Sequence, residues 1–308
     1  MYVVNNNNCW FTNVGEAFID IGVKSIINNI AAKHSEIKFA AISPMSNYYL
    51  NAIGYRENKK YNAFDPTQWL VPDVCIFAGM YGTAKFADSH TLEIARNIKR
   101  AGGKIAFLGF GAEQYDDKER NVVIKVLEEL KPLLLVTRDE KTYMLYKDYV
   151  DCIKGLDCAF WVNDDYMPVN MKSKKYVVST FNRSDEPDDV ACMDNLIHPW
   201  HMQYSLDNKK TRYLSKKNLM ISDSPYEYLT LYANADRVYT DLVHATVASL
   251  AYGTPVKYYQ IDERRDVFES LEYLKYDNEG FMSVDMDELN KEKIKIETYV
   301  CNKILGLK

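Results

Sequence analysis

The chain has 308 residues, of which 47% are hydrophobic and 26% are charged. A domain usually contains roughly 100 to 200 residues, so this length is sufficient for two domains that each bury a core. The formal net charge of -5, from 43 acidic and 38 basic residues, provides no broad basic surface for a polyanion. The composition therefore argues against nucleic acid as a partner.

The N-terminal stretch and the cysteines predict a cytoplasmic protein. "MYVVNNNNCWFTNVGEAF" has no charged segment followed by an apolar one, and no stretch of the chain approaches the ~20 apolar residues that a membrane span requires. The six cysteines include no C-x-x-C pair and are too sparse for a disulfide framework. We therefore expect a reduced, cytoplasmic protein without a membrane span.

Apolar runs alternate with segments of helical period along the first half of the chain. In chain order, the predicted elements are a strand at 1–4, a helix at 15–33, strands at 37–43 and 73–79, a helix at 91–100, a strand at 105–108, a glycine-bearing loop at 109–111, a helix at 116–131, a strand at 133–137 and a helix at 138–149. Near-continuous apolar strands that alternate with helices are typical of a parallel sheet covered on both faces.

The same alternation begins again after a polar, Pro-containing linker at 162–173, "VNDDYMPVNMKS". The predicted elements of this second series are strands at 174–182 and 217–222, a helix at 224–235, a strand at 236–240, a helix around 245–251, a strand at 255–259, and helices at 263–274 and 286–304.

This doubled alternation predicts an α/β fold of two Rossmann-like, doubly wound domains that face a cleft. We place an N-terminal domain at residues 1–162, on the acceptor side, and a C-terminal domain at residues 163–308, on the donor side. The last helix either crosses back onto the first domain or forms a partner surface.

Ligands of open α/β sheets bind beyond the carboxyl ends of the strands. His244 follows the strand at 236–240 and precedes a helix of small residues that Gly253 and Pro255 end. The loops at 13–16, 109–111 and 182–183 also follow predicted strands or begin predicted helices. The loop "GFGAE" lacks the third glycine of a dinucleotide fingerprint, so NAD binding is not supported.

Three stretches resemble the polysaccharide pyruvyl transferase family. "NVGEAFID" at 13–20 is similar to the family's N-x-G-D-x-A-I start. "VTRDEKTYMLYKD" with the later "GLDCAF" resembles its R-D-E-x-S and D-P-A-F motifs, and "LVHATVASLAYGTP" resembles its R-L-H-A segment with a following G-x-P. The order and spacing of these stretches extend the resemblance over nearly the whole chain.

The resemblance implies a two-domain fold of the glycosyltransferase B type. It implies transfer of a pyruvyl group from phosphoenolpyruvate to a sugar, as a ketal, in exopolysaccharide or cell-wall biosynthesis. Phosphoenolpyruvate would be a co-substrate and no cofactor would be needed. The partner would be a sugar of a cell-surface glycan or of its lipid-linked precursor, which leaves peripheral association with a membrane open.

The resemblance also assigns roles to residues of the second half. His244 matches the family's histidine and would act as general acid or base, which is the usual work of a positioned imidazole. Arg183 approximately matches an anion-binding arginine, and with Asn182 it would bind the donor, because arginine forks suit phosphate and carboxylate groups. A satisfied, purely structural histidine is the alternative for His244, and a solvated loop charge is the alternative for Arg183.

The first half supplies the remaining assigned residues. Asn13, Gly15 and Glu16 would face the acceptor, and a backbone that approaches a ligand closely favours glycine. Glu16 stands where the family usually has aspartate, and a charge that favours the start of a helix is the other interpretation of it. We expect Arg138 and Asp139 to be structural, through helix capping and an internal ion pair.

One position departs from the family in a way that bears on the donor. Leu242 stands where the family has an arginine, and an apolar side chain cannot pair with phosphate or carboxylate. Either another cation, such as Arg237, Arg264 or Arg265, replaces it, or the donor has changed. The alternative functions are therefore a glycosyltransferase that uses a nucleotide-sugar donor, or a catalytically inactive glycan-binding homologue.

"HPWH" at 198–201 suggests a metal site, but Pro199 predicts a turn and no cysteine or carboxylate stands at a recurring zinc spacing. We expect no metal, and a second interpretation has Trp200 stacking on a sugar ring. The basic cluster at 207–218 is either a solvated face or a contact for phosphate-bearing acceptors or a membrane surface.

Overall fold

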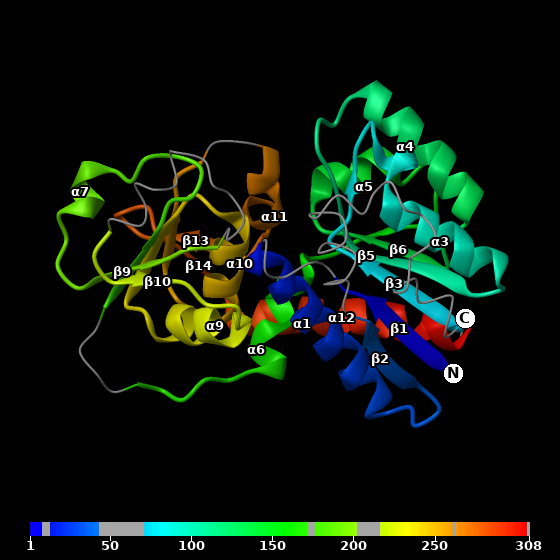
Figure 1. Cartoon of the computed structure of the whole chain (residues 1–308), viewed down its shortest axis with the longest axis horizontal. Coiled ribbons are helices and arrows are strands. Elements are labelled where there is room, and N and C mark those ends of the chain that lie inside the picture. Colours follow the sequence, from blue (N-terminus) through cyan, green and yellow to red (C-terminus); the bar gives the residue numbers. More distant parts are fainter. Residues whose placement is uncertain (8–12, 43–70, 172–175, 202–215, 261–262, 307–308) are drawn as a thin grey trace. The chain divides into compact units, whose positions relative to one another are not determined.

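The computed structural model describes residues 1–7, 13–42, 71–171, 176–201, 216–260 and 263–306 (Figure 1). The chain divides into two compact units. The first contains Met1–Cys9, Val23–Cys158 and Glu292–Lys308, and the second contains Trp10–Gly22 and Ala159–Lys291.

These units differ in part from the two ranges expected from the sequence, 1–162 and 163–308. The chain passes from the first unit to the second after residue 158. Helices α1 (Val14–Ala31) and α12 (Met286–Leu305) are each divided between the two units. A helix of 18 residues is roughly 27 Å long, so one helix can contribute its two ends to different cores. Contacts, rather than chain order, therefore decide where these helices belong.

The first unit contains an entirely parallel sheet with the strand order β2-β1-β3-β5-β6-β7, and the short β4 pairs with β5. Its strands are β1 (Tyr2–Asn6), β2 (Lys38–Ile42), β3 (Val74–Ala78), β4 (Tyr81–Gly82), β5 (Lys104–Ala112), β6 (Leu134–Thr137) and β7 (Ile153–Lys154). Its further helices are η4 (Phe86–Asp88), α3 (His90–Arg100), α4 (Asp117–Leu130) and α5 (Glu140–Tyr146). In η5 (Cys158–Trp161) the chain passes into the second unit.

Both faces of this sheet are buried, as the near-continuous apolar strands predicted. Phe77 and Phe107 belong to a core cluster that also contains residues of α3, α4 and α5, and these helices lie together in Figure 1. On the opposite face Val136 is 1% exposed, and Gly155 lies between Val136 and Ile296 of α12. Strand alternation thus places successive side chains in two different cores.

The predicted loop at 109–111 is wrong, because these residues belong to β5. The register of β5 against β6 shifts between Phe107 and Phe110, and Gly109 has a φ of +63°. Glycine adopts this left-handed conformation without a steric penalty. The bulge lets the strand continue to Ala112, where it pairs with β4.

The second unit contains five parallel strands in the order β10-β9-β8-β11-β12, extended by the antiparallel β14 and β13. The strands are β8 (Val177–Thr180), β9 (Leu196–Pro199), β10 (Leu219–Met220), β11 (Arg237–Thr240), β12 (Val256–Tyr258), β13 (Leu274–Tyr276) and β14 (Met282–Val284). The helices are α6 (Val162–Asp165), α7 (Asp188–Ala191), α9 (Pro225–Asn234), α10 (Val243–Ala251), η7 (Glu263–Arg265) and α11 (Asp266–Glu269).

Two predicted elements of this unit are corrected. His198 and Pro199 of "HPWH" end β9 and do not form a turn. The N–H of His198 donates to Asn218, next to β10, and the N–H of Trp200 donates to Met220 in β10, while Pro199, which lacks an N–H, lies between them. The helix predicted at 263–274 is reduced to η7 and α11, because the chain turns after Ser270 and Leu274 pairs with Val284 in the sheet.

The predicted linker at 162–173 begins with α6, and its residues 172 and 173 lie outside the described residues.

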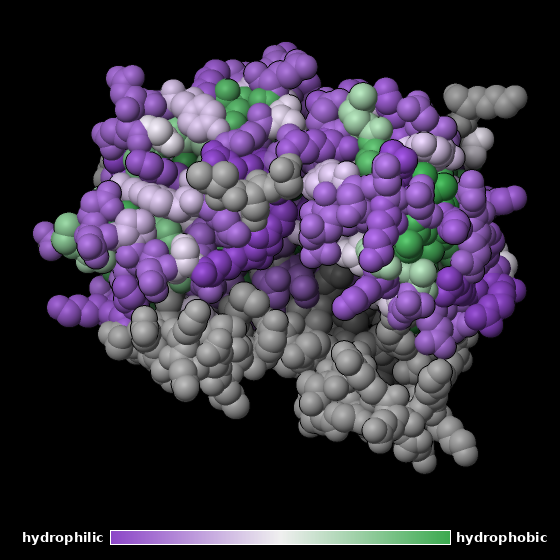
Figure 2. Space-filling view, turned by 90° about the horizontal axis from the view of Figure 1, so that it is seen from above, coloured by the Kyte–Doolittle hydropathy of each residue, from purple (hydrophilic) through white to green (hydrophobic). Residues whose placement is uncertain are grey.

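The described residues on the face seen in Figure 2 are largely hydrophilic, and hydrophobic residues form small, separate groups there. No helix in the described part of the chain combines the length and apolar character that a membrane crossing requires.

Candidate functional site

The second sheet has a topological switch point between β8 and β11. From β8 the chain proceeds outward to β9 and β10, and it then returns to place β11 and β12 on the other side of β8. Ligands of doubly wound sheets bind beyond the carboxyl ends of the two strands at such a point. Here those ends lead into residues 181–184 and 241–244, which contain three of the predicted site residues, Asn182, Arg183 and His244.

The carboxylate of Asp241 joins these two loops. Asp241 is 1% exposed, and it accepts the backbone N–H groups of Asn182 (3.0 Å), Arg183 (2.7 Å) and Ser184 (2.7 Å). The Ser184 hydroxyl donates to the same carboxylate at 3.0 Å. Charge-assisted hydrogen bonds of this kind are about twice as strong as neutral ones, so Asp241 fixes the loop that presents Asn182 and Arg183. The sequence analysis did not identify Asp241, although its place at the end of a strand was a usable signal.

His244 lies in the first turn of α10 and is half-buried. A Cβ at Gly15 would lie 2.7 Å from Cδ2, 2.8 Å from Cβ and 2.8 Å from Cγ of His244. The backbone of α1 therefore lies directly against this imidazole, and only glycine leaves room for it. Asn13 shapes this start of α1, because its Oδ1 accepts the Gly15 N–H at 3.2 Å and its carbonyl oxygen accepts the Glu16 N–H at 3.0 Å.

The placement of Asn13, Gly15 and Glu16 differs from the prediction. The sequence analysis assigned them to an N-terminal domain, across a cleft from His244, whereas they belong to the same compact unit as His244. The physical reason is the division of α1, whose first part packs with the second unit. The structure therefore brings Asn13 and Gly15 together with the loops at the switch point.

His201 connects the start of α1 to the loop after β8. Its carbonyl oxygen accepts the Val14 N–H at 3.1 Å, and its own N–H donates to Oδ1 of Asn182 at 3.1 Å. The ring is 1% exposed, and its Nε2 is hydrogen-bonded to the Tyr232 hydroxyl. Burial, followed by the neighbouring His244, lowers the pKa of His201 to about 3. His201 is therefore a neutral positioning residue, which the sequence analysis considered only as a metal ligand.

This buried neutral ring predicts a dependence of stability on pH. The unfolded chain binds a proton at His201 near the ordinary pKa of 6.5, whereas the folded chain does so only near 3. Stability is complete above about pH 6.5 and is lost as the pH falls toward 3, by on the order of 5 kcal/mol in total.

We therefore expect the melting temperature of the second unit to fall more steeply between about pH 6.5 and pH 4 in the unaltered protein than in His201→Gln, which cannot titrate there. Thermal unfolding followed by circular dichroism across this range measures the difference. His34→Gln in the first unit is the matched control for the removal of a histidine elsewhere in the chain. Equal slopes for His201→Gln and the unaltered protein would contradict the assignment.

The two predicted donor residues present unused hydrogen-bonding groups. The Nδ2 atom of Asn182 is buried and has no hydrogen-bond partner among the described residues. The side chain of Arg183 is exposed, and its guanidinium forms no ion pair with any described residue. Leu242, by contrast, is 6% exposed and supplies no polar group to the site.

Arg237 cannot replace the cation that Leu242 lacks. It is the first residue of β11, at the amino end of the strand whose carboxyl end leads to His244. Its Nη1 pairs with Glu279 at 2.7 Å, and its guanidinium lies 4.7 Å from the centre of the Phe281 ring. Arg264 and Arg265, in η7, instead follow the carboxyl end of β12.

Arg138 and Asp139 lie at the end of β6 in the first unit. Asp139 is the N-cap of α5 and accepts the Thr142 N–H at 2.6 Å. The buried guanidinium of Arg138 lies 3.7 Å from Asp139, 3.8 Å from Asp157 and 4.2 Å from the centre of the Tyr81 ring. Although burial opposes it, these neighbours hold the pKa of Arg138 above its usual value.

The two histidines of "HPWH" have separate partners. His198 contacts the Lys217 carbonyl oxygen through Nδ1 at 2.8 Å and the Glu186 carboxylate through Nε2 at 3.0 Å, whereas His201 contacts Tyr232. Lys216 pairs with the same carboxylate. The rest of the predicted basic cluster, 207–215, lies outside the described residues.

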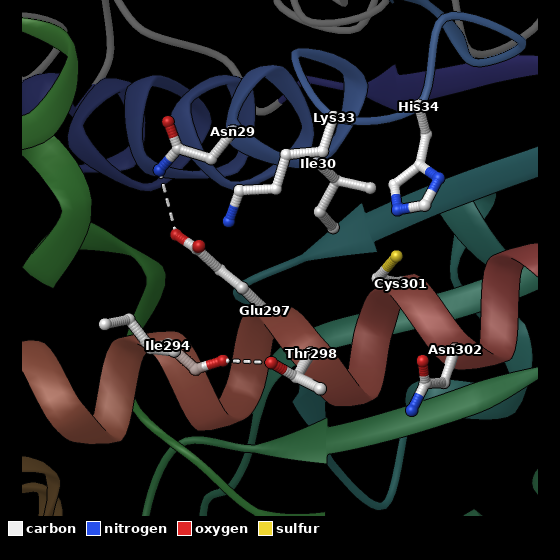
Figure 3. Close-up of a pocket in the computed structure, with 9 residues that line it drawn as sticks. All are labelled: Asn29, Ile30, Lys33, His34, Ile294, Glu297, Thr298, Cys301 and Asn302. Carbon is white, nitrogen blue, oxygen red and sulfur yellow. Dashed lines mark hydrogen bonds between the residues drawn. The ribbon is translucent and has the colours of Figure 1, made fainter.

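A groove of about 220 Å³ lies in the first unit between α12 and the end of α1 with the turn that follows it (Figure 3). Asn29 crosses it to donate to Glu297 at 2.9 Å. None of the site residues predicted from the sequence lines this groove. The lining residues are Asn29, Ile30, Lys33, His34, Ile294, Glu297, Thr298, Cys301 and Asn302.

Known structures share the fold of this chain. A putative UDP-N-acetylglucosamine 2-epimerase from Listeria monocytogenes matches with a TM-score of 0.58 and 9% identity, over 99% of this chain and 90% of its own. The UDP-N-acetylglucosamine 2-epimerase from Rickettsia bellii matches with a TM-score of 0.53 and 15% identity, over 98% of this chain and 96% of its own. The UDP-GlcNAc 2-epimerase from Methanocaldococcus jannaschii matches with a TM-score of 0.52 and 12% identity, over 97% of this chain and 99% of its own. The fold is therefore GT-B-like, with Rossmann-like α/β domains.

No curated relative matches the sequence. The family model of the polysaccharide pyruvyl transferases matches residues 13–256, which include Asn13, Gly15, Asn182, Arg183 and His244. The match covers most of the chain and contains both loops at the switch point. The chain therefore belongs to the polysaccharide pyruvyl transferase family.

Proposed function

We propose that this protein transfers a pyruvyl group from phosphoenolpyruvate to a sugar of a cell-surface glycan or of its lipid-linked precursor, as a ketal. One observation carries the proposal: within the stretch that matches the family, Gly15 lies against His244 beside the carboxyl ends of β8 and β11. This is where a doubly wound sheet binds its ligand. The switch point thus combines an imidazole with unused donor groups.

The reaction needs groups of this kind. Two sugar hydroxyl oxygens form bonds to C2 of phosphoenolpyruvate, the bond from C2 to the phosphate oxygen breaks, and the methylene carbon gains a proton to become a methyl group. Each hydroxyl loses one proton, of which one goes to the methylene carbon and one leaves with inorganic phosphate. In this proposal His244 moves these protons as general acid or base, which typically contributes about 100- to 10,000-fold to a rate.

The donor's two anionic groups need oriented donors. In this proposal Arg183 and the Nδ2 of Asn182 bind the donor anion, supported by the exposed guanidinium and by the buried amide nitrogen that lacks a partner. Asp241 holds the loop that carries both residues. In this proposal Asn13, Gly15 and Glu16, at the start of α1, face the acceptor.

A nucleotide-sugar donor is the competing proposal. The Methanocaldococcus jannaschii epimerase has also been solved in complex with UDP-GlcNAc and UDP, and it matches this chain with a TM-score of 0.51, 14% identity and coverage of 97% of this chain and 99% of its own. Leu242 is compatible with a changed donor. The proposals differ in the ligand that the native protein binds.

Thermal shift separates the two ligands, because a ligand that binds only the native state raises its stability by about 2.7 kcal/mol at 100 times its Kd. We expect saturable stabilisation by phosphoenolpyruvate and none by UDP. Pyruvate and inorganic phosphate, each carrying one of the donor's anionic groups, serve as controls and should stabilise less. Stabilisation by UDP alone would overturn pyruvyl transfer in favour of a nucleotide-sugar donor.

A further inference from the structure

Arg265 lies beside the candidate site, in η7, which follows the carboxyl end of β12, the strand next to β11. Tyr258, the last residue of β12, is in register with Thr240, the last residue of β11, and the Tyr259 N–H donates to the Thr240 carbonyl oxygen at 2.9 Å. The guanidinium of Arg265 lies 6.0 Å from the centre of the Tyr258 ring. Because neighbouring strands are about 4.8 Å apart, Arg265 and the loop that carries His244 both lie at the carboxyl ends of the strands.

The protein satisfies only part of the hydrogen-bonding capacity of the Arg265 guanidinium. Its Nη2 pairs with Glu269 in α11, and its side chain is 28% exposed. Its Nε is buried and has no hydrogen-bond partner in the part of the chain that the structure describes. A partly exposed i,i+4 ion pair contributes little to stability, so it does not account for a buried donor left unused.

Two other buried polar atoms without hydrogen-bond partners belong to the loops on either side of β11. They are Nδ2 of Asn182, after β8, and Oε1 of Gln260, after β12. An unsatisfied buried polar atom destabilises the folded state, so three such atoms near the carboxyl ends of neighbouring strands are the pattern expected of a site that a polar ligand completes. The exposed Arg183 also lies there, in the loop after β8.

We infer that Arg265 is a second anion-binding residue of the donor site, which pairs with one anionic group of a small dianionic ligand while Arg183 pairs with the other. Arg183 and Arg265 follow β8 and β12, the two neighbours of β11, so their strands are roughly 10 Å apart and their long side chains can converge on a ligand between them. The inference rests on the proposed function. Arg265 lies beyond residue 256, where the family match ends.

The test compares the binding of phosphoenolpyruvate to the unaltered protein and to Arg265→Gln by isothermal titration calorimetry. Loss of a charge-assisted pair is expected to weaken binding by about 10- to 100-fold. Arg265→Lys keeps the charge without the planar fork and should lie between the two. Arg237→Gln, which removes an ion-paired arginine at the opposite end of β11, is the matched control and should bind as the unaltered protein does.

The possible failures are distinguishable. If the unaltered protein binds phosphoenolpyruvate and both Arg265 variants bind it equally well, the role of Arg265 is overturned and the proposed function stands. If the unaltered protein does not bind phosphoenolpyruvate, the proposed function fails and the inference fails with it. Circular dichroism of each variant verifies the fold, and Arg265→Lys retains a cation over Tyr258 if the glutamine variant is unstable.

Discussion

Replacement of His244 by alanine is expected to lower the rate of pyruvyl transfer by about 100- to 10,000-fold, because a positioned general acid or base contributes that much. The binding of phosphoenolpyruvate should change by less than about threefold, since arginine side chains rather than the imidazole hold the donor anion in this proposal. The release of inorganic phosphate from phosphoenolpyruvate, in the presence of a panel of glycan-precursor sugars, measures the rate.

The same variant separates catalysis from structure. His244 is half-buried at the start of α10, so its truncation should lower stability by no more than about 1 to 2 kcal/mol. His244→Asn keeps a polar side chain that cannot act as an acid or base near neutral pH, and it should be as inactive as the alanine variant. Full turnover by either variant would show that His244 is a structural residue.

The substitution Gly15→Ala should impair the enzyme through His244. The new Cβ would lie under 3.0 Å from three atoms of that residue, one of which is its Cβ, so side-chain rotation cannot relieve the overlap. Either α1 or α10 must shift, at a cost of about 1 to 3 kcal/mol. A displacement of the imidazole by about 1 Å is expected to lower the rate by about 100-fold. Alanine is intrinsically the better helix former by about 1 kcal/mol, so a loss of stability would identify the contact as its cause.

Two comparisons isolate that cause. Adding Gly15→Ala to His244→Ala should lower activity little further, because no ring remains to be displaced, and this non-additivity is the signature of contact. Gly102→Ala, at a glycine with no heavy atom within 4 Å of its potential Cβ, should leave activity unchanged even though its φ of +96° makes alanine strained there. Normal activity of Gly15→Ala would mean that the two helices separate freely.

The local structure followed from the sequence where apolar periodicity was unambiguous. The strands around Val74 and Leu134 and the helices around Leu92 and Val123 are present, because each satisfies its own pattern of burial whatever its neighbours are. The pattern was insufficient at Gly109, where a bulge continues a strand that two glycines seemed to end. It was also insufficient at Pro199, where strand pairing made the missing N–H harmless.

The candidate site could be predicted only in part, because its residues come from distant parts of the chain. His244, Asn182 and Arg183 follow strands and could be found on that basis. Asp241 also follows a strand, but its role depends on the loop at 182–184, 57 to 59 residues away. His201 could not be found in this way, since a buried ring acquires its role through Tyr232, 31 residues away. Nothing in the apolar pattern of α1 signals that Gly15 lies against His244.

The sequence by itself determined the type and order of most elements, the doubled α/β alternation and the family motifs. These depend on side-chain periodicity and turn chemistry, which are local properties. The tertiary structure alone decided which compact unit contains Asn13 and Gly15, and which buried polar atoms lack partners among the described residues. It also decided that Arg237 lies at the amino ends of the strands of the second sheet and Arg265 near their carboxyl ends. Those facts depend on strand order and helix packing, because a sheet brings together residues that the chain separates.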